Sequence, residues 1–217
     1  PTPVDPNAET TAWFDGSKTE YTISTIGEMK GLVTLSQSQT FAGITIKLGA
    51  DIVWNEGDAK TWSNTAPANV WNAIAQSNVN GFLGTFDGQG HTISGLYYNG
   101  NGYAALVGRL YSTGVVKNVA VINSYLKSTT GTESFHHSSG VVGRMNNGAS
   151  VENVYTNAIL VAEKSAGIVA FNDGGNTIIK NCWFDGAIVA TNAGNAAGMI
   201  GSVVNSKEHT IENCLFT

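Results

Sequence analysis

An aspartate and a histidine stand four positions apart in the glycine-rich stretch GTFDGQGHTISGL, residues 84–96. Asp87 and His91 are residue types that act as a general acid and a general base when their side chains reach one substrate. Asp-Gly is also a strong turn signal, and Gly90 suits a positive φ angle. We therefore expect a tight corner between strands here, with His91 as an outward polar residue, rather than an acid–base pair.

Two glutamates, Glu152 and Glu212, are the candidates for a glycosidase pair. An inverting enzyme needs two carboxyl groups about 6.5–9.5 Å apart, and two strand spacings would separate these by roughly 9.6 Å. Both take the second position of a recurring four-residue signature, and Lys117 and Lys180 take it in the alternate copies. A lysine between two glutamates keeps both ionised, whereas the acid of such a pair needs a raised pKa. We predict a salt-bridge ladder here and no catalytic residue.

Histidines and cysteines offer little further chemistry. His136 and His137 lie in a long polar insertion, but the side chains of adjacent residues diverge, so we expect no metal site and no cofactor. Cys182 and Cys214 take the signature position that valine takes in other copies. Buried thiols are the favoured interpretation, and a disulfide between neighbouring coils stays open in an oxidising compartment.

Aromatic residues are the most suggestive candidates for binding. The residue two after the turn position of the signature is Tyr97, Tyr155 or Trp183 in three of the copies. Exposed aromatic rings stack on sugar rings and also mark protein interfaces. Trp62 and Trp71, in a segment without repeat character, would extend this surface. The alternative is that this segment folds over the aromatic column and buries it.

An internal repeat supplies the elements that must position these residues. The tetrapeptides ALVG, GVVG, GIVA and GMIG start at residues 105, 140, 167 and 198. Each is followed by the signature VKNV, VENV, IKNC or IENC, and ISGL at 93–96 is taken as an earlier copy. The third residue of each signature copy is expected to occupy the same left-handed turn position, so that these residues stack from coil to coil. Stacked amides there predict a hydrogen-bonded ladder, built on Gly95, Asn118, Asn153, Asn181 and Asn213.

Irregular spacing around a constant core predicts an all-β fold, a right-handed parallel β-helix of about five to six coils. Thr25 and Glu28 form a capping-box pattern, so a short helix over 25–35 is expected to plug the N-terminal end. The expected divisions are a linker over 1–12 and one domain over 13–217, with a long excursion over 55–80 and repeat coils over 81–217. The sequence stops in mid-coil at IENCLFT, and we expect a neighbouring module or a further coil to cover that strand edge.

These residues resemble a known family. The run from YTISTIGEMKGL through FAGITIKLGADI and GFLGTFDGQGHTISGL to the GVVG and VENVY units is similar to the GLUG-motif repeat proteins, over roughly residues 21–217. The resemblance implies a parallel β-helix in a bacterial protein that is secreted or held at the cell surface. It implies little about chemistry, because the motif occurs in adhesin-like proteins and beside unrelated catalytic domains. The excursion over 55–80 is longer than such units commonly have.

Composition narrows the classes of function. Only 12% of residues are charged, the net charge is −5, and 26 of 217 residues are glycine, which suits an extracellular all-β protein with many turns. Scattered cations argue against nucleic acid, and no apolar run approaches the ~20 residues of a membrane span. We expect a non-catalytic, secreted or cell-surface module that binds a polysaccharide, a host-surface glycan or a protein receptor. A structural spacer is the alternative, and a polysaccharide lyase or glycoside hydrolase is less favoured.

Overall fold

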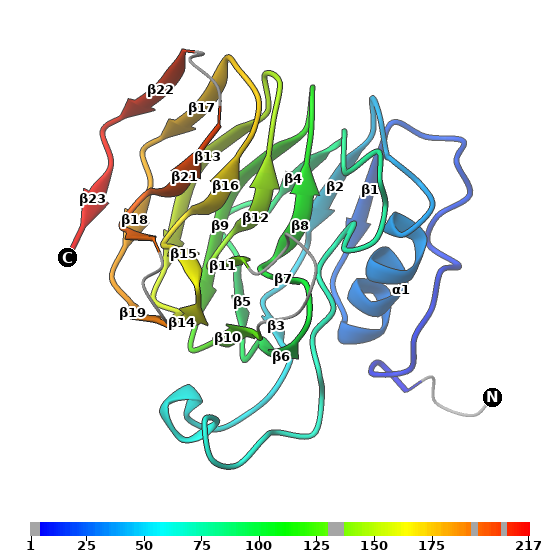
Figure 1. The fold of residues 1–217 in the computed structure, drawn as a ribbon. Coiled ribbons are helices and arrows are strands. Elements are labelled where there is room, and N and C mark those ends of the chain that lie inside the picture. Colours follow the sequence, from blue (N-terminus) through cyan, green and yellow to red (C-terminus); the bar gives the residue numbers. More distant parts are fainter. Residues whose placement is uncertain (1–4, 130–136, 192–194, 205–207) are drawn as a thin grey trace.

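The chain folds as a parallel β-solenoid with one N-terminal helix (Figure 1). The computed structural model describes residues 5–129, 137–191, 195–204 and 208–217. Three sheets of four parallel strands run along it. The β6 sheet holds β6 (Tyr97–Gly100), β10 (Tyr125–Ser128), β14 (Ile159–Ala162) and β19 (Ala187–Ala190). The β7 sheet holds β7 (Tyr103–Ala104), β11 (His137–Ser139), β15 (Lys164–Ala166) and β20 (Ala196–Ala197). The β8 sheet holds β8 (Val107–Leu110), β12 (Val142–Met145), β16 (Val169–Asn172) and β21 (Ile200–Val203).

A fourth sheet of eleven strands, the long sheet, runs the length of the molecule. Its main path is β1 (Glu20–Ile23), β2 (Thr45–Leu48), β4 (Thr85–Asp87), β9 (Val115–Ile122), β13 (Ser150–Thr156), β17 (Thr177–Lys180) and β22 (His209–Glu212). Beside this path lie β3 (Ile52–Val53), β5 (Thr92–Ser94), β18 (Trp183–Phe184) and β23 (Leu215–Phe216). A complete turn places one strand in each of the four sheets, and the three shorter sheets have four strands each, so the solenoid has about four turns. β1 and β2 pair only within the long sheet and add no complete turn, so the predicted five to six coils are too many.

The two repeated signatures form inward columns, as predicted. Val116, Val151 and Ile179 are opposite one another on adjacent strands and are fully buried. The backbone bends directly after each of these strand segments, which lets the apolar residue three positions later also point inward. The bend lies at the predicted asparagines, whose φ angles of 51–54° fall in the left-handed region that asparagine tolerates.

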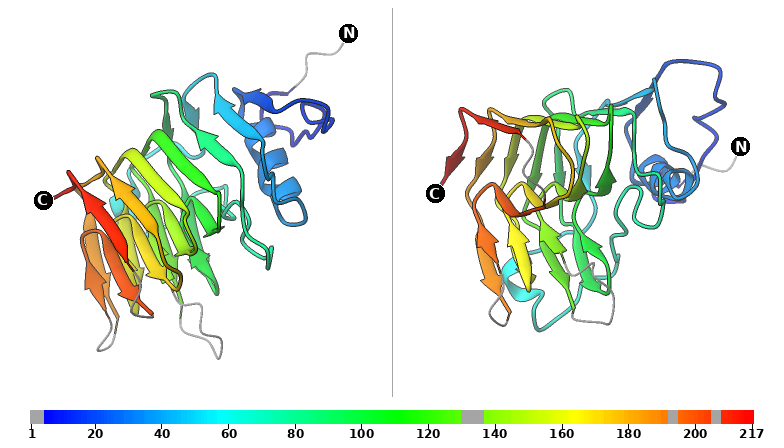
Figure 2. Two further views of the ribbon diagram at one scale, coloured as in Figure 1. Left: turned by 90° about the horizontal axis from the view of Figure 1, so that it is seen from above. Right: turned by 45° about the horizontal axis from the view of Figure 1, so that its top comes forward.

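Helix α1 (Ile26–Ser36) covers the N-terminal end of the stacked turns (Figure 2). Its N-cap is Thr25, whose side chain accepts a hydrogen bond from the backbone of Glu28, and the Glu28 carboxylate accepts from Thr25 N in return. The predicted capping box is therefore present. Within the described residues, α1 and every other helix are too short and too polar to span a bilayer.

Residues 5–12 belong to the domain, whereas 1–12 was expected to be a linker. Gly27 N donates to Pro6 O at 2.8 Å, and Thr10 N donates to Gly27 O at 3.0 Å. A Cβ atom added at Gly31 would lie 1.9 Å from Thr10 O. The described part of the N-terminal segment therefore lies directly on α1, because two glycines of the helix leave room for its backbone.

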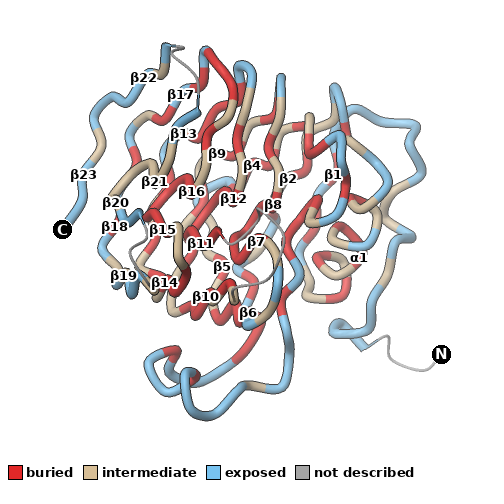
Figure 3. Tube along the Cα trace, in the orientation of Figure 1, coloured by how far each residue is buried: buried red, intermediate tan, exposed pale blue. Residues whose placement is uncertain are grey.

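The excursion is shorter than the predicted 55–80. Trp71 N donates to Tyr97 O at 2.7 Å, and isolated bridges join Ile74 to Val107 and Phe82 to Leu110. Residues 71–82 therefore already follow the path of the next turn. Only residues 55–70, which include the 3₁₀ helix η1 (Ala59–Thr61), leave it, as the loop at the bottom of Figure 3, where most residues are exposed.

Candidate functional site

The structure gives Asp87 and His91 separate partners. Asp87 Oδ1 accepts hydrogen bonds from Gln89 N and Asn118 Nδ2, both at 3.0 Å. His91 Nδ1 lies 3.2 Å from Asp51 Oδ1 instead. The stretch is a corner between β4 and β5, as the turn chemistry predicts, and these contacts assemble no acid–base pair from Asp87 and His91.

Asparagine amides form a hydrogen-bonded ladder along the bend of the long sheet. Each amide Nδ2 donates to the side-chain Oδ1 of the previous turn, at 3.0, 3.0, 2.9 and 3.3 Å for Asn118, Asn153, Asn181 and Asn213 in that order. The first acceptor is Asp87. Although partial burial opposes its charge, the hydrogen bonds from Gln89 and Asn118 hold the pKa of Asp87 below its usual value.

Gly95 does not belong to this ladder, contrary to the prediction. The register pairs Ile93 with Val121 and Ser94 with Ile122, which puts Gly95 opposite Asn123. Both have positive φ angles, 78° for Gly95 and 46° for Asn123. These two turns have a second left-handed corner after the one at the ladder position, and the alignment of ISGL with VKNV took the second corner for the first.

The charged column beside the ladder alternates in sign. Glu152 lies opposite Lys117 on one side and Lys180 on the other, and Lys180 lies opposite Glu212. Lys180 Nζ is 3.2 Å from a carboxylate oxygen of Glu212. Lys117 Nζ is 3.5 Å from Asp87 Oδ2. The two glutamates are thus separated by the strand that carries Lys180.

Tyr155 and Trp183 form an aromatic pair on the outer face of the long sheet. They are opposite each other on adjacent strands, with ring centroids 4.9 Å apart and planes inclined by 56°. Trp183 is 43% exposed, and Tyr155 is half-buried. Trp183 Nε1 donates to Thr217 Oγ1 at 3.1 Å, which orients the indole.

A shallow hollow of about 580 Å³ adjoins this pair. Its lining combines the ring of Tyr155 with the ladder amides of Asn118 and Asn153 and with the corner residues Gln89 and Gly90. Amides donate and accept hydrogen bonds, and an aromatic ring offers a flat apolar face. The arrangement suits a ligand with alternating hydroxyl groups and apolar faces.

The other three aromatic candidates are buried, so they do not extend this face. The rings of Tyr97 and Trp62 pack at 6.2 Å and 90°, and Tyr97 also stacks on Tyr125. Trp71 is fully buried and its Nε1 donates to Ala105 O at 2.8 Å. The cause is that the excursion folds over the outer face of the β6 sheet, whereas Trp71 is part of the core. Tyr97 pairs with Tyr125 and not with the column of Tyr155.

The remaining candidates for chemistry are the two cysteines and the adjacent histidines. Cys182 is buried and Cys214 is half-buried, and both are free thiols. His137 is buried between the rings of Tyr103 and Phe171, at 5.9 and 5.0 Å. His136 lies outside the described residues. Across the part of the chain that the structure describes, no three His, Cys, Asp or Glu side chains gather as metal ligands would.

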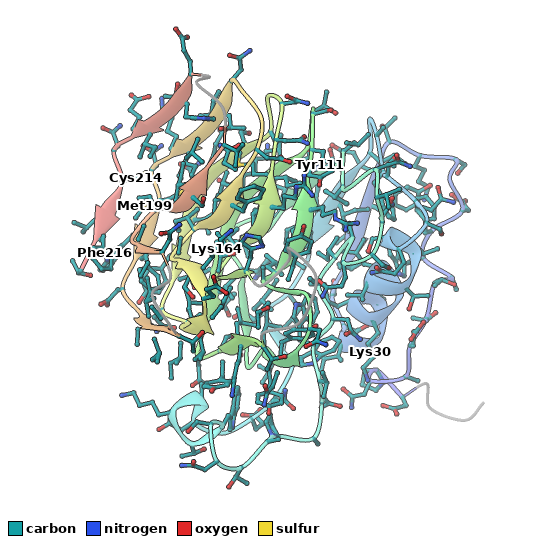
Figure 4. The ribbon with its side chains drawn as sticks, in the orientation of Figure 1. Lys30, Tyr111, Lys164, Met199, Cys214 and Phe216 are labelled. Atoms are coloured by element: carbon teal, nitrogen blue, oxygen red, sulfur yellow. The ribbon has the colours of Figure 1, made fainter. Side chains whose placement is uncertain are left out.

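The sequence interpretation missed a basic groove between the β7 and β8 sheets. It encloses about 390 Å³ and is lined by Tyr103, His137, Arg144, Lys164, Phe171, Ser202 and Val204. Figure 4 labels Lys164 on the face formed by these two sheets. The missed indication was present in the repeat, because VGRL and VGRM carry the chain's two arginines at equivalent positions.

Comparisons with known proteins bear on the fold and define no family. No protein family model matches the chain. Over 118 residues, 54% of this chain, it is 30% identical to halomucin from Haloquadratum walsbyi (strain DSM 16790 / HBSQ001), but it spans only 1% of that protein. The crystal structure of a proposed immunoglobulin A1 protease from Bacteroides ovatus superposes with a TM-score of 0.54 and 19% identity, covering 97% of this chain and 70% of that one. At this identity the likeness concerns the fold alone, so the conclusion is a parallel β-solenoid that shares its fold with the Bacteroides ovatus protein.

Proposed function

We propose that this chain is a non-catalytic extracellular module that binds a glycan through the outer face of the long sheet. One observation carries the proposal: the exposed Trp183 stands beside Tyr155 at the end of a shallow hollow lined with ladder amides. Sugars present apolar ring faces and hydroxyl groups together, and aromatic rings with nearby amides match both. The ladder also holds these amides in fixed positions, which lowers the entropy cost of binding.

The charges on this face support binding rather than hydrolysis. A glycosidase needs one carboxyl group that is protonated at working pH. Lys180 stands between Glu152 and Glu212 in this column, and its ammonium group is 3.2 Å from a carboxylate oxygen of Glu212, so the two carboxyl groups do not face each other across an open site. The polysaccharide lyase or glycoside hydrolase is therefore the less favoured hypothesis.

The extracellular location is supported by the comparisons and by the repeat. Immunoglobulins circulate outside cells, so a protease that acts on immunoglobulin A1 works there, and the Bacteroides ovatus structure carries that description. The name halomucin also points to an extracellular protein. The resemblance to GLUG-motif repeats agrees with a secreted or surface-held bacterial protein, in which other modules adjoin this one.

A structural spacer that binds nothing, or an adhesin segment that binds a protein receptor, is the second candidate. The burial of Tyr97 and Trp62 favours it, because on the β6 sheet the outward aromatic column serves packing. The two hypotheses differ in what the pair of Tyr155 and Trp183 does.

Affinity electrophoresis and a glycan array with plant, microbial and mucin polysaccharides test the proposal. We expect retardation by at least one neutral polysaccharide, weakened roughly tenfold or more in the double variant Tyr155→Ala/Trp183→Ala. Phe216→Ala is the matched control, since it removes an aromatic ring that is also exposed but follows Leu215 on the opposite face of its strand. Absence of binding to every glycan would leave the spacer, and undiminished binding by the double variant would move the site elsewhere.

A further inference from the structure

We propose that the hollow beside Tyr155 takes an N-acetylated amino sugar, such as an N-acetylglucosamine unit, in the gap that Ala120 leaves in the surface. This assignment rests on the proposed glycan-binding function and narrows it to one class of sugar. Three features of the hollow point to this class: its shape, the unused hydrogen-bonding capacity of its ladder amides, and its uncharged lining residues.

An outward column of the long sheet has its smallest side chain at the hollow. The column consists of residues that are opposite one another on successive strands: Thr92, Ala120, Tyr155, Trp183 and Leu215. The side chain of Ala120 ends at Cβ, whereas its neighbour Tyr155 carries a ring, so the surface drops from one turn to the next. Both residues line the hollow of about 580 Å³. A pyranose ring that stands against Tyr155 can therefore extend over Ala120.

A wide corner bounds the hollow on the side away from the aromatic ring. Residues 88–91 span this corner between β4 and β5, where the following turn needs only 118–119. The longer corner is held against that turn, because Gly90 N donates to Asn118 O at 2.8 Å. Its central residues, 89–90, are exposed and line the hollow. The hollow therefore lies between a corner and an aromatic ring, which suits one sugar ring of a glycan chain.

The ladder amides in the hollow can bind one further amide. A side-chain amide has two N–H donors and an oxygen with two lone pairs. Asn118 and Asn153 each donate one N–H to the preceding rung and accept one hydrogen bond from the following rung. Among the residues that the structure describes, no other group uses the second N–H or the second lone pair of these two side chains. An acetamido group offers a matching donor and acceptor, so it can bond to a rung as the rungs bond to one another.

The other lining residues suit the methyl group of an acetamido substituent. Val119, Ala120 and Tyr155 supply apolar surface beside the amides. The methyl group gains from contact with such surface, whereas the hydroxyl group that glucose carries in its place does not. Of the described residues that line the hollow, none carries a charge, so a carboxylated sugar would lose hydration here without forming an ion pair. A neutral N-acetylated sugar therefore fits the hollow better than glucose or a uronic acid.

Titration calorimetry of the whole chain with chitotetraose and cellotetraose tests this assignment. The two linear oligosaccharides share one backbone and linkage, and differ in whether C2 of each ring carries an acetamido or a hydroxyl group. We expect chitotetraose to bind at least about tenfold more tightly than cellotetraose. Ala120→Tyr places a ring over the gap and should weaken the binding of chitotetraose by about tenfold or more. Leu215→Tyr is the matched control, since it adds the same ring at an exposed position of the same column and should not weaken binding.

The outcomes separate the class of sugar from the proposed function. Equal affinity for the two oligosaccharides, or unchanged affinity of Ala120→Tyr for chitotetraose, would overturn the assignment and leave a glycan-binding face. Binding of another glycan on the array without binding of chitotetraose would do the same. Absence of binding to every glycan would overturn the proposed function itself. Thermal unfolding of Ala120→Tyr and Leu215→Tyr shows whether a lost affinity reflects a lost fold, and the comparison of the two oligosaccharides needs no variant.

Discussion

The contacts of the Asp87 carboxylate give the corner that contains it a structural role. Asp87 resembles half of an acid–base pair in the sequence, but its oxygens accept from Gln89 and Asn118 and approach Lys117. These contacts stabilise the ionised form, which is the opposite of what a general acid requires. Asp87 therefore anchors the first rung of the amide ladder, where the following turns carry asparagine.

Asp87→Asn should reduce stability at neutral pH and flatten its acid dependence. The pKa of Asp87 is lowered in the folded state, so its charge stabilises the fold above the unfolded value of about 3.9 and this contribution disappears as the pH falls through the folded pKa. The side chain is buried, and we expect a loss of about 1 kcal/mol at pH 7 that shrinks toward zero in strong acid.

Urea unfolding across the acid range measures this difference. Asp185→Asn, which removes a carboxylate beside Thr217 near the end of the chain, is the matched control. A gap between Asp87→Asn and the unmodified chain that stays constant down to strong acid would contradict the assignment, because an amide–amide contact has no such pH dependence.

At the scale of elements, the sequence predicts those features of the fold that interactions between nearby residues alone determine. The capping box at Thr25 is such a case, and so is the left-handed bend within VENV, where Asn153 has a φ angle of 54°. The repeat also aligns the turns correctly from Val107 onward. The alignment of the repeat fails at ISGL, because glycine and asparagine both tolerate the left-handed backbone conformation that either of the two corners requires.

Features that depend on contacts between distant segments could not be predicted. Nothing local in Trp62 or Trp71 says that one ring packs against Tyr97 and the other enters the core. The groove was equally hidden, since it needs the β7 and β8 sheets to meet at a close corner. Gly143 permits this approach, because a Cβ atom there would lie 2.6 Å from the Tyr103 ring.

Trp62→Ala and Trp71→Ala should therefore have different effects, the first on the local stability of the excursion and the second on the stability of the whole fold. Trp62 belongs to a small cluster outside the main core, and the excursion has further hydrogen bonds from Asn123 to Gly57 and from Ala59 to Asn123. We expect Trp62→Ala to open residues 55–70 to protease while the turns stay folded. Trp71→Ala should lower the free energy of unfolding by about 3–5 kcal/mol.

Limited proteolysis with mass spectrometry and a thermal melt of each variant check this pair. A cooperative loss of the whole fold in Trp62→Ala would mean that the excursion is integral to the turns. A stable Trp71→Ala would mean that its indole contributes little to the core.

At the scale of the whole molecule, burial falls toward the last turn. The inward residue of the signature is fully buried at Val116, Val151 and Ile179 but 50% exposed at Ile211. The two cysteines occupy one column on adjacent turns and can report this gradient.

The two thiols should react at very different rates in the folded protein. Burial raises the pKa of Cys182 to about 12, and this residue is only 1% exposed. The thiolate is the reactive form, so we expect Cys182 to react at least about a hundredfold more slowly than the half-buried Cys214. Ellman's reagent measures both phases, and Cys214→Ser should remove the fast one alone. Equal rates would show that the last two turns open together.

Because the turns repeat, the number of turns determines the length of a binding surface along the solenoid. The signature recurs after 35, 28 and 32 residues, yet each turn contributes one residue to every outward column. Duplication or deletion of one whole turn would therefore lengthen or shorten such a surface by one strand spacing, about 4.8 Å, while each remaining residue keeps its neighbours. Gain or loss of a turn during evolution would therefore change how many sugar units the protein contacts without changing which sugar it recognises.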